Sequence, residues 1–254
     1  MGGAVVDERT QGALLLAVGG IAIRLGVTDA ALAYVKPGLQ PPLTIAGAFL
    51  AVIGVLTVVR AFRGKPDELD LHGHADHGHG HQPGHGPAVA WLLTLPLLAL
   101  LLIAPPPLGA FAAGRQSDRP LTRNSAAFGP LPDPTQDGAI ELKLSEYVFR
   151  ALYDDQRSLE DKTIRLTGFV TKAEQEGTAF QLTRFMLACC AADGQAVNVG
   201  IRTDQPAPPV DTWLEIDGTW EPLPGHTIGE ISKEAPILAA TGIREIPAPA
   251  QPYE

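Results

Sequence analysis

The chain has 254 residues, 45% of them hydrophobic, and a formal net charge of −9; this length allows one or two domains. The region 140–254 has 18 Asp and Glu residues against 10 Lys and Arg residues, so nearly all of the negative charge lies there. A groove for a phosphate backbone requires a basic surface, and we therefore exclude nucleic acid as a partner.

Three nearly uncharged stretches predict a transmembrane region over residues 1–104, with spans at about 11–35, 43–62 and 88–104. The second span is the clearest, because its 20 residues match the thickness of a bilayer. The third ends at Pro105, and proline terminates helices. These spans predict a multi-pass protein of the cell membrane, held in the lipid bilayer by three helices.

The first span contains Arg24, and a charge inside a membrane is costly. We interpret Arg24 as reaching one membrane surface along its aliphatic stem. The alternative is a contact with a partner membrane protein. A signal peptide fits this span less well, because Arg24 interrupts the apolar core and no small-x-small cleavage site precedes the next span.

Flanking basic residues indicate the orientation. One set would lie on one side of the membrane and a second set on the other: Arg9, Arg60, Arg63 and Lys65 against Lys36, Arg115, Arg119 and Arg123. The first set lies closer to the membrane ends, so we expect the N-terminus and the loop 63–87 in the cytoplasm. The C-terminal domain is then extracytoplasmic.

The loop 63–87 contains six of the seven histidines of the chain, all within 14 residues: His72, His74, His77, His79, His81 and His85. Gly, Pro and Asp fill the gaps, so we expect this loop to be disordered. Neutral imidazole binds Zn, Ni, Cu or Co. The tract therefore predicts metal binding; the alternative is a solvated polar linker.

The remainder of the chain predicts a linker over 105–139 and a soluble β domain over 140–254. Apolar residues have helical spacing over 144–152. Alternating segments then predict five strands, at 164–170, 179–187, 196–202, 212–220 and 236–246. This pattern is typical of an all-β fold, a small OB-like five-stranded barrel with one short helix. Gly168 and Gly218 interrupt two of the strands, where we expect a bend or a bulge.

The only two cysteines, Cys189 and Cys190, are adjacent. They could bind a soft metal ion, close a vicinal disulfide, or pack as small residues. Neighbouring residues of a strand point to opposite faces, so joint action requires the strand to end or bulge at Cys189. The pair Asp193-Gly194 predicts a turn that brings Asp193 back towards the sulfurs. Because a carboxylate raises thiol pKa, we expect metal binding or a disulfide rather than nucleophilic catalysis.

No catalytic motif accompanies these residues. His226 is the only histidine of the C-terminal domain, and the sequence has no HExxH, no Walker motif and no CxxC. We therefore expect that the protein is not an enzyme.

Several phrases resemble those of a known family. They are Tyr34-Val35-Lys36-Pro37, the His-rich loop, Pro107-Leu108, the strand 166–170, the RF-x(3)-CC-x-AD phrase that begins at Arg184, the segment 213–219, and Pro252-Tyr253. In these phrases the chain resembles the YcgQ-like family of permease subunits, bacterial membrane proteins with a C-terminal domain of unknown function. The resemblance implies a separate polytopic membrane permease as partner and a connection with Zn2+. It extends to a site only at Cys189, Cys190 and Asp193.

Two functional hypotheses follow. In the first, the protein is an accessory subunit of a membrane permease that handles zinc through the His-rich loop and the Cys-Cys site. In the second, it is a non-catalytic membrane scaffold or a redox-sensing module, which recruits a partner through its β-barrel. A membrane-tethered oxidoreductase is disfavoured by the missing CxxC.

Overall fold

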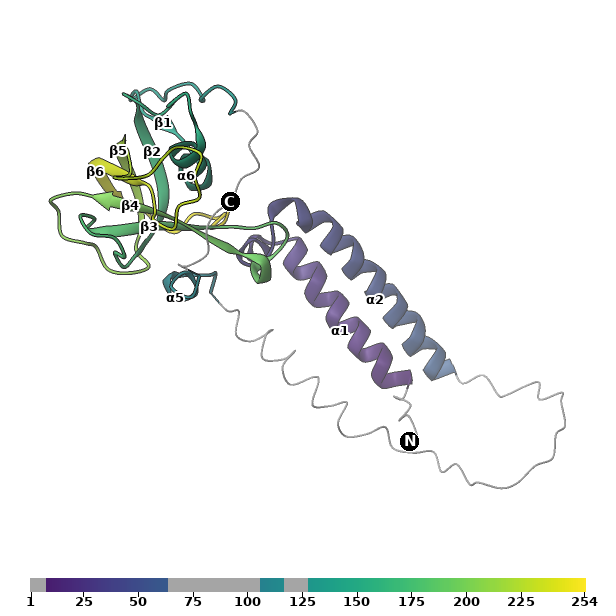
Figure 1. Cartoon of the computed structure of the whole chain (residues 1–254). Coiled ribbons are helices and arrows are strands. Elements are labelled where there is room, and N and C mark those ends of the chain that lie inside the picture. Colours follow the sequence, from purple (N-terminus) through teal and green to yellow (C-terminus); the bar gives the residue numbers. More distant parts are fainter. Residues whose placement is uncertain (1–7, 64–105, 117–127) are drawn as a thin grey trace, which may run out of the picture. The chain divides into compact units, whose positions relative to one another are not determined.

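The computed structural model describes residues 8–63, 106–116 and 128–254 (Figure 1). The described residues form two compact units. The first contains the helices α1 (Glu8–Gly26) and α2 (Gln40–Arg63). The second contains the C-terminal domain, residues 106–116 and the short segment 32–37 that connects the two helices in sequence.

Glycines at every seventh position form the contact between α1 and α2, which pack as an antiparallel pair (Figure 1). The contact residues are Gly12, Gly19 and Gly26 on α1 and Gly47 and Gly54 on α2. A Cβ atom at position 19 would lie 2.7 Å from the backbone nitrogen of Ala51 and 2.7 Å from the carbonyl oxygen of Gly47. Only glycine allows two helix backbones to approach this closely.

Large apolar side chains remain exposed on α2: Ile45, Phe49, Val52, Val55, Leu56 and Phe62. Among the described residues, the helical stretch Pro37–Arg63 is the one that is long and apolar enough to cross a membrane. A single helix of this kind gives weak support for membrane association. The predicted three-helix region is not established, since the span 88–104 and the loop 64–87 lie outside the described residues.

The predicted first span, 11–35, needs correction. Its helix ends at Gly26 and is followed by a 3₁₀ turn over Asp29–Ala33. Arg24 therefore lies in the last helical turn rather than in the middle of a span. A cation is favourable there, because the carbonyl end of a helix carries partial negative charge.

The C-terminal domain is a closed five-stranded β-barrel with a short helix, as the alternating segments predict. Its strands are β2 (Thr163–Thr171), β3 (Phe180–Met186), β4 (Gln195–Arg202), β5 (Trp213–Glu221) and β6 (Ile237–Glu245). The order is β2-β3-β4-β6-β5, and β5 closes the barrel by pairing with β2. The pair β4 and β6 is parallel, and the other four pairs of the barrel are antiparallel.

Both predicted glycine irregularities have a structural basis. The register of β5 against β6 shifts between Asp217 and Gly218, which confirms a bulge there. At Gly168 a Cβ atom would lie 2.7 Å from the carbonyl oxygen of Thr183 on the neighbouring strand. Glycine therefore permits the close approach of β2 and β3 at this point.

The main core fills the barrel and the space under α6 (Leu144–Tyr153). Inward-facing residues of β2, such as Ile164 and Leu166, are fully buried with Leu182 of β3. From α6, Tyr147 enters this core and donates its hydroxyl to the carbonyl of Ile237 at 2.7 Å. A two-residue strand, β1 (Ile140–Glu141), pairs parallel with β2 beside the helix.

A second, smaller core covers the outer face of β2 and β3. Phe169 and Phe185 stack there with ring centroids 6.1 Å apart, and Tyr253 packs edge-on against Phe185. The short helix α5 (Ala110–Ala113) contributes Ala113 to this core. Part of the predicted linker 105–139 is therefore folded onto the barrel, because its alanines and Leu108 cover exposed aromatic surface.

Candidate metal centre

The Cys-Cys pair lies in a turn between two strands, which confirms that the strand ends before Cys189. Strand β3 stops at Met186, a 3₁₀ turn spans Ala191–Asp193, and β4 begins at Gln195. Cys190 is the residue before the 3₁₀ turn and has extended backbone angles. On a strand, two adjacent side chains point to opposite faces. Because these cysteines lie in a turn, this restriction does not apply to them.

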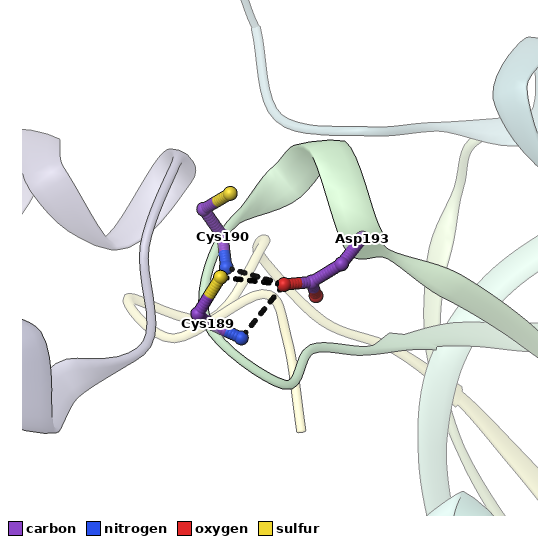
Figure 2. A group of neighbouring side chains, drawn as sticks. All are labelled: Cys189, Cys190 and Asp193. Carbon is purple, nitrogen blue, oxygen red and sulfur yellow. Dashed lines mark hydrogen bonds between the residues drawn. The ribbon is translucent and has the colours of Figure 1, made fainter.

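Asp193 folds back onto this turn, as the sequence predicts (Figure 2). Its Oδ1 accepts the backbone N–H of Ala188 at 2.8 Å. Its Oδ2 accepts the N–H groups of Cys189 at 2.8 Å and Cys190 at 3.1 Å. The Cys189 thiol donates to the same oxygen, with Sγ 2.7 Å from Oδ2. One carboxylate thus holds three consecutive backbone donors and a sulfur in place.

These contacts shift both ionisation equilibria in opposite directions. The thiol hydrogen bond and the backbone donors hold the pKa of Asp193 well below its usual range. The same carboxylate raises the pKa of Cys189 to about 11, and its hydrogen bond with the thiol is the largest cause. Because this pKa lies well above neutral pH, the Cys189 thiol keeps its proton at pH 7, and a protonated thiol is a poor nucleophile.

The geometry suits a soft metal ion. The sulfurs of Cys189 and Cys190 and a carboxylate oxygen of Asp193 all lie within 4.8 Å of one another. Cys189 is exposed and Cys190 half-buried, and both are free thiols. Two thiolates and one carboxylate are ligand types that Zn2+ accepts, and the exposed position leaves space for a fourth ligand. To coordinate an ion, the carboxylate of Asp193 would have to give up its hydrogen bond with the Cys189 thiol.

The turn is bound on one side by the segment that connects α1 and α2 in sequence. Val35 forms an isolated antiparallel bridge with Cys190. The N–H of Lys36 donates to the carbonyl of Cys189 at 3.1 Å, and the N–H of Ala191 donates to the carbonyl of Tyr34 at 2.7 Å. Two phrases far apart in sequence, 34–37 and 184–193, therefore meet at the Cys turn.

The hydroxyl of Tyr253 joins two segments near the turn. It donates to the carbonyl of Ala33 at 2.8 Å and accepts the N–H of Leu108 at 2.8 Å. Lys36 adds a contact from its ammonium group to the carbonyl of Leu187 at 3.3 Å. No role for Lys36 or Tyr253 follows from the sequence motifs alone. Their only signal is membership of the short phrases that surround the Cys-Cys phrase in the family resemblance.

The other predicted metal ligands are not brought to this turn. His72, His74, His77, His79, His81 and His85 lie outside the described residues. Within the described ranges, Cys189, Cys190 and Asp193 form the one group of three or more potential ligands. His226 is half-buried in the barrel domain, with Nε2 3.4 Å from the carbonyl oxygen of Leu152.

The fold and the turn define a class of protein domain: a small closed β-barrel with one helix, which presents a Cys-Cys-Asp turn on its surface. Residues 129–254 match the sequence model of the DUF1980 C-terminal domain. This match covers the whole barrel and the Cys turn, and it is consistent with the YcgQ-like resemblance. A comparison with curated proteins found no match.

Proposed function

We propose that this protein is a non-catalytic accessory subunit of a membrane permease and that it binds zinc at the Cys turn. The observation that carries the proposal is the approach of three ligand atoms, from Cys189, Cys190 and Asp193, to within 4.8 Å. Their positions depend on a turn that Asp193 itself organises through three backbone hydrogen bonds.

The protonated state of Cys189 makes zinc binding at this turn dependent on pH. Zinc binds thiolate, so each bound thiol must lose its proton to the solvent. Because the pKa of Cys189 is about 11, zinc has to compete with a firmly held proton. The affinity at this turn should therefore rise with pH above neutrality. Such a site suits reversible binding better than permanent storage.

The membrane part of the proposal rests on α2 and on the charges at the ends of the helices. Arg9 places its guanidinium 5.1 Å from the ring centroid of Phe62, so Arg9 and the C-terminal end of α2 lie together. Arg60 and Arg63 lie in the last turn of α2. This concentration of positive charge favours a cytoplasmic location for that end of the pair. We propose a multi-pass membrane protein with an extracytoplasmic barrel.

The strand order and the parallel β4–β6 pair support an OB-like barrel. Its net charge of −8 over residues 140–254 favours cations over nucleic acid as partners. The His-rich tract, proposed to lie on the opposite side of the membrane, would gather metal ions there. A polytopic permease would supply the path across the membrane.

Metal binding is tested on the purified full chain in detergent. We expect one zinc ion to be lost when Cys189 and Cys190 are both replaced by serine, and further ions to be lost when the six histidines of the tract are replaced. Metal content by mass spectrometry and calorimetry with zinc at pH 6.5 and 8.0 give the readouts. Equal zinc content in the wild-type protein and the double serine variant would overturn the metal role of the turn.

Partnership is tested by co-purification with the permease encoded nearest to this chain. The wild-type protein should retain that permease in mild detergent. The double serine variant should retain it too, because the helices rather than the thiols make the contact in this proposal. Failure of the wild-type chain to retain it would contradict the subunit role.

A redox-sensing module is the second candidate, because both thiols are free, adjacent and accessible. An oxidising extracytoplasmic environment would favour a vicinal disulfide. Mass spectrometry of the alkylated protein before and after reduction separates the two roles. A disulfide in the protein isolated without reductant would favour redox sensing over zinc.

A further inference from the structure

A pocket of about 570 Å³ lies on the outer face of the barrel, beside α5. Its floor is formed by outward-facing residues of three adjacent strands: Thr171 of β2, Gln181 of β3 and Asn198 of β4. The Cys turn does not contribute to its lining. This volume falls in the range of pockets that hold small organic molecules.

Gln181 is the first indication of a ligand. The residue is only 5% exposed, and it lines the pocket. Its carboxamide can donate and accept hydrogen bonds, so it is a polar group that a molecule inside the pocket can use.

Asn198 gives a second indication, through a chain of hydroxyl groups. Thr183 donates its hydroxyl to Asn198 Oδ1 at 2.9 Å. The Thr183 proton is used in that bond, so Thr171 is the donor in the 2.7 Å contact between the hydroxyls of Thr171 and Thr183. This chain orients the amide of Asn198, so its NH₂ group is the part left for a ligand. The floor is consequently rich in donors, which favours a ligand with acceptor oxygens.

The rim and walls narrow the class of ligand. Lys172 and Arg115 supply positive charge, and Glu174 and Asp211 supply negative charge. Asp211 is already engaged, because its Oδ1 accepts the N–H of Ala110. The walls include apolar surface from Ala113 and Val210. Cationic groups beside a donor floor and an apolar wall suit a carboxylate that carries a small apolar part.

We infer that this pocket binds a small organic carboxylate of about amino-acid size. The carboxylate receives hydrogen bonds from Asn198 and Gln181 and faces Lys172. The apolar part of the ligand lies against α5. This site is separate from the Cys turn and does not rest on the proposed zinc function.

The test uses full-length, ¹⁵N-labelled protein in detergent and two probes, N-acetyl-leucine and its neutral amide. N-acetyl-leucine should shift the side-chain amide resonances of Gln181 and Asn198 in a saturable way. The neutral amide should bind at least about tenfold more weakly, the equivalent of one lost charge-assisted hydrogen bond. No saturable shift with N-acetyl-leucine, or equal binding of the two probes, would overturn the proposal.

Two variants locate the binding. Asn198→Asp keeps the acceptor for Thr183 but replaces the donor NH₂ by a carboxylate oxygen, and it should reduce N-acetyl-leucine binding by about tenfold or more. Lys172→Met should weaken it as well. Lys233→Met, at an exposed position outside the pocket lining, is the matched control and should have no effect. Unchanged binding by both pocket variants, with unchanged spectra elsewhere, would place the molecule at another surface and reject this site.

Discussion

At the scale of single residues, Asp193 determines what the Cys turn can do. Its carboxylate accepts three backbone N–H groups and the Cys189 thiol, so it shapes the turn and also holds the thiol in its protonated form. A protein that used Cys189 as a nucleophile would need the opposite effect on the thiol pKa. The arrangement agrees with a site where metal replaces a proton.

We predict that Asp193→Asn increases the reactivity of Cys189. The pKa of this thiol is about 11, first because of its hydrogen bond with the Asp193 carboxylate and then because of Cys190, and it should fall towards the usual value near 9 in the variant. The thiolate fraction at pH 8 would then rise about a hundredfold. Lower intrinsic nucleophilicity at lower pKa reduces the gain in rate to roughly tenfold.

The measurement is the rate of alkylation by iodoacetamide from pH 7 to 10, in a Cys190→Ser background so that one thiol reports. Because the folded pKa of Cys189 is raised, the wild-type rate should still be climbing at pH 10, while the Asp193→Asn rate should level off earlier. Asp204→Asn, at an exposed position away from the turn, is the control. Superimposable pH profiles would show that the carboxylate does not govern the thiol.

At the scale of elements, two devices hold helices in place. Glycines at heptad spacing bring α1 and α2 into backbone contact. In the barrel domain, α6 has no side-chain cap at Lys143, and the carboxylate of Glu254 takes this role from the far end of the chain. It accepts the N–H of Leu144 at 2.7 Å and that of Ser145 at 2.9 Å. Both devices depend on residues distant in sequence.

Replacing Gly19 by leucine should separate the two helices. Any Cβ at this position would meet the backbone of α2 at 2.7 Å. The helix α2 cannot move aside without losing the other glycine contacts between the two helices, which we call the glycine seam. Spin labels at positions 9 and 62 in a chain without native cysteines report the distance between helices. The variant should give a longer and broader distribution than the wild-type sequence.

Gly20 offers a closely matched control, because it follows Gly19 directly and a Cβ there would meet nothing within 4 Å. Gly20→Leu has the same change in helix propensity but should leave the distance distribution unchanged. Equal behaviour of the two variants would mean that the glycine seam does not hold the pair together.

The Glu254 cap gives a prediction on stability. Glu254→Ala leaves two N–H groups of α6 without their acceptor, and loss of such a cap costs about 1 kcal/mol. Denaturant unfolding of the full chain in detergent, followed by the fluorescence of Trp213 and Trp220, measures this difference. Glu230→Ala at an exposed site should change the free energy of unfolding by much less. If Glu254→Ala and Glu230→Ala unfolded at the same denaturant concentration, the cap would contribute nothing to stability.

At the scale of the whole molecule, the proposed orientation separates the His-rich tract and the barrel across a membrane. Positive charge gathers where Arg9 meets the end of α2, and the barrel carries a strong negative charge. By the positive-inside rule, we expect the positively charged helix ends on the cytoplasmic side, which places the barrel on the other side in the proposed topology. In the proposed topology, the His-rich tract and the Cys turn would meet different pools of ions.

Sidedness is checked with single cysteines in a chain whose native cysteines are serine. Ile231→Cys, at an exposed position of the barrel domain, should react with a membrane-impermeant maleimide on intact cells. Arg63→Cys, at the end of α2, should react only after the cells are opened. The reverse labelling pattern would invert the topology and place the barrel in the cytoplasm.

Much of the barrel could be predicted from sequence, because its signals are local. Alternation of apolar and polar residues locates all five strands to within about two residues, and α6 follows from helical spacing. The turn at Cys189 and the return of Asp193 were also predictable, since the Asp193-Gly194 pair lies three residues after Cys190. The end of the first helix was not, because apolar composition continues past Gly26 while the backbone does not.

The sequence by itself determined the individual strands, the helix α6, the position of the cysteines in a turn and the direction of the thiol pKa shift. Each of these depends on residues within a few positions of one another. Only the tertiary structure decided that Val35 pairs with Cys190, that Glu254 caps α6, and that Gln181 and Asn198 line one pocket. These contacts join residues far apart in the chain, and their partners are selected by the closure of the barrel rather than by any local pattern.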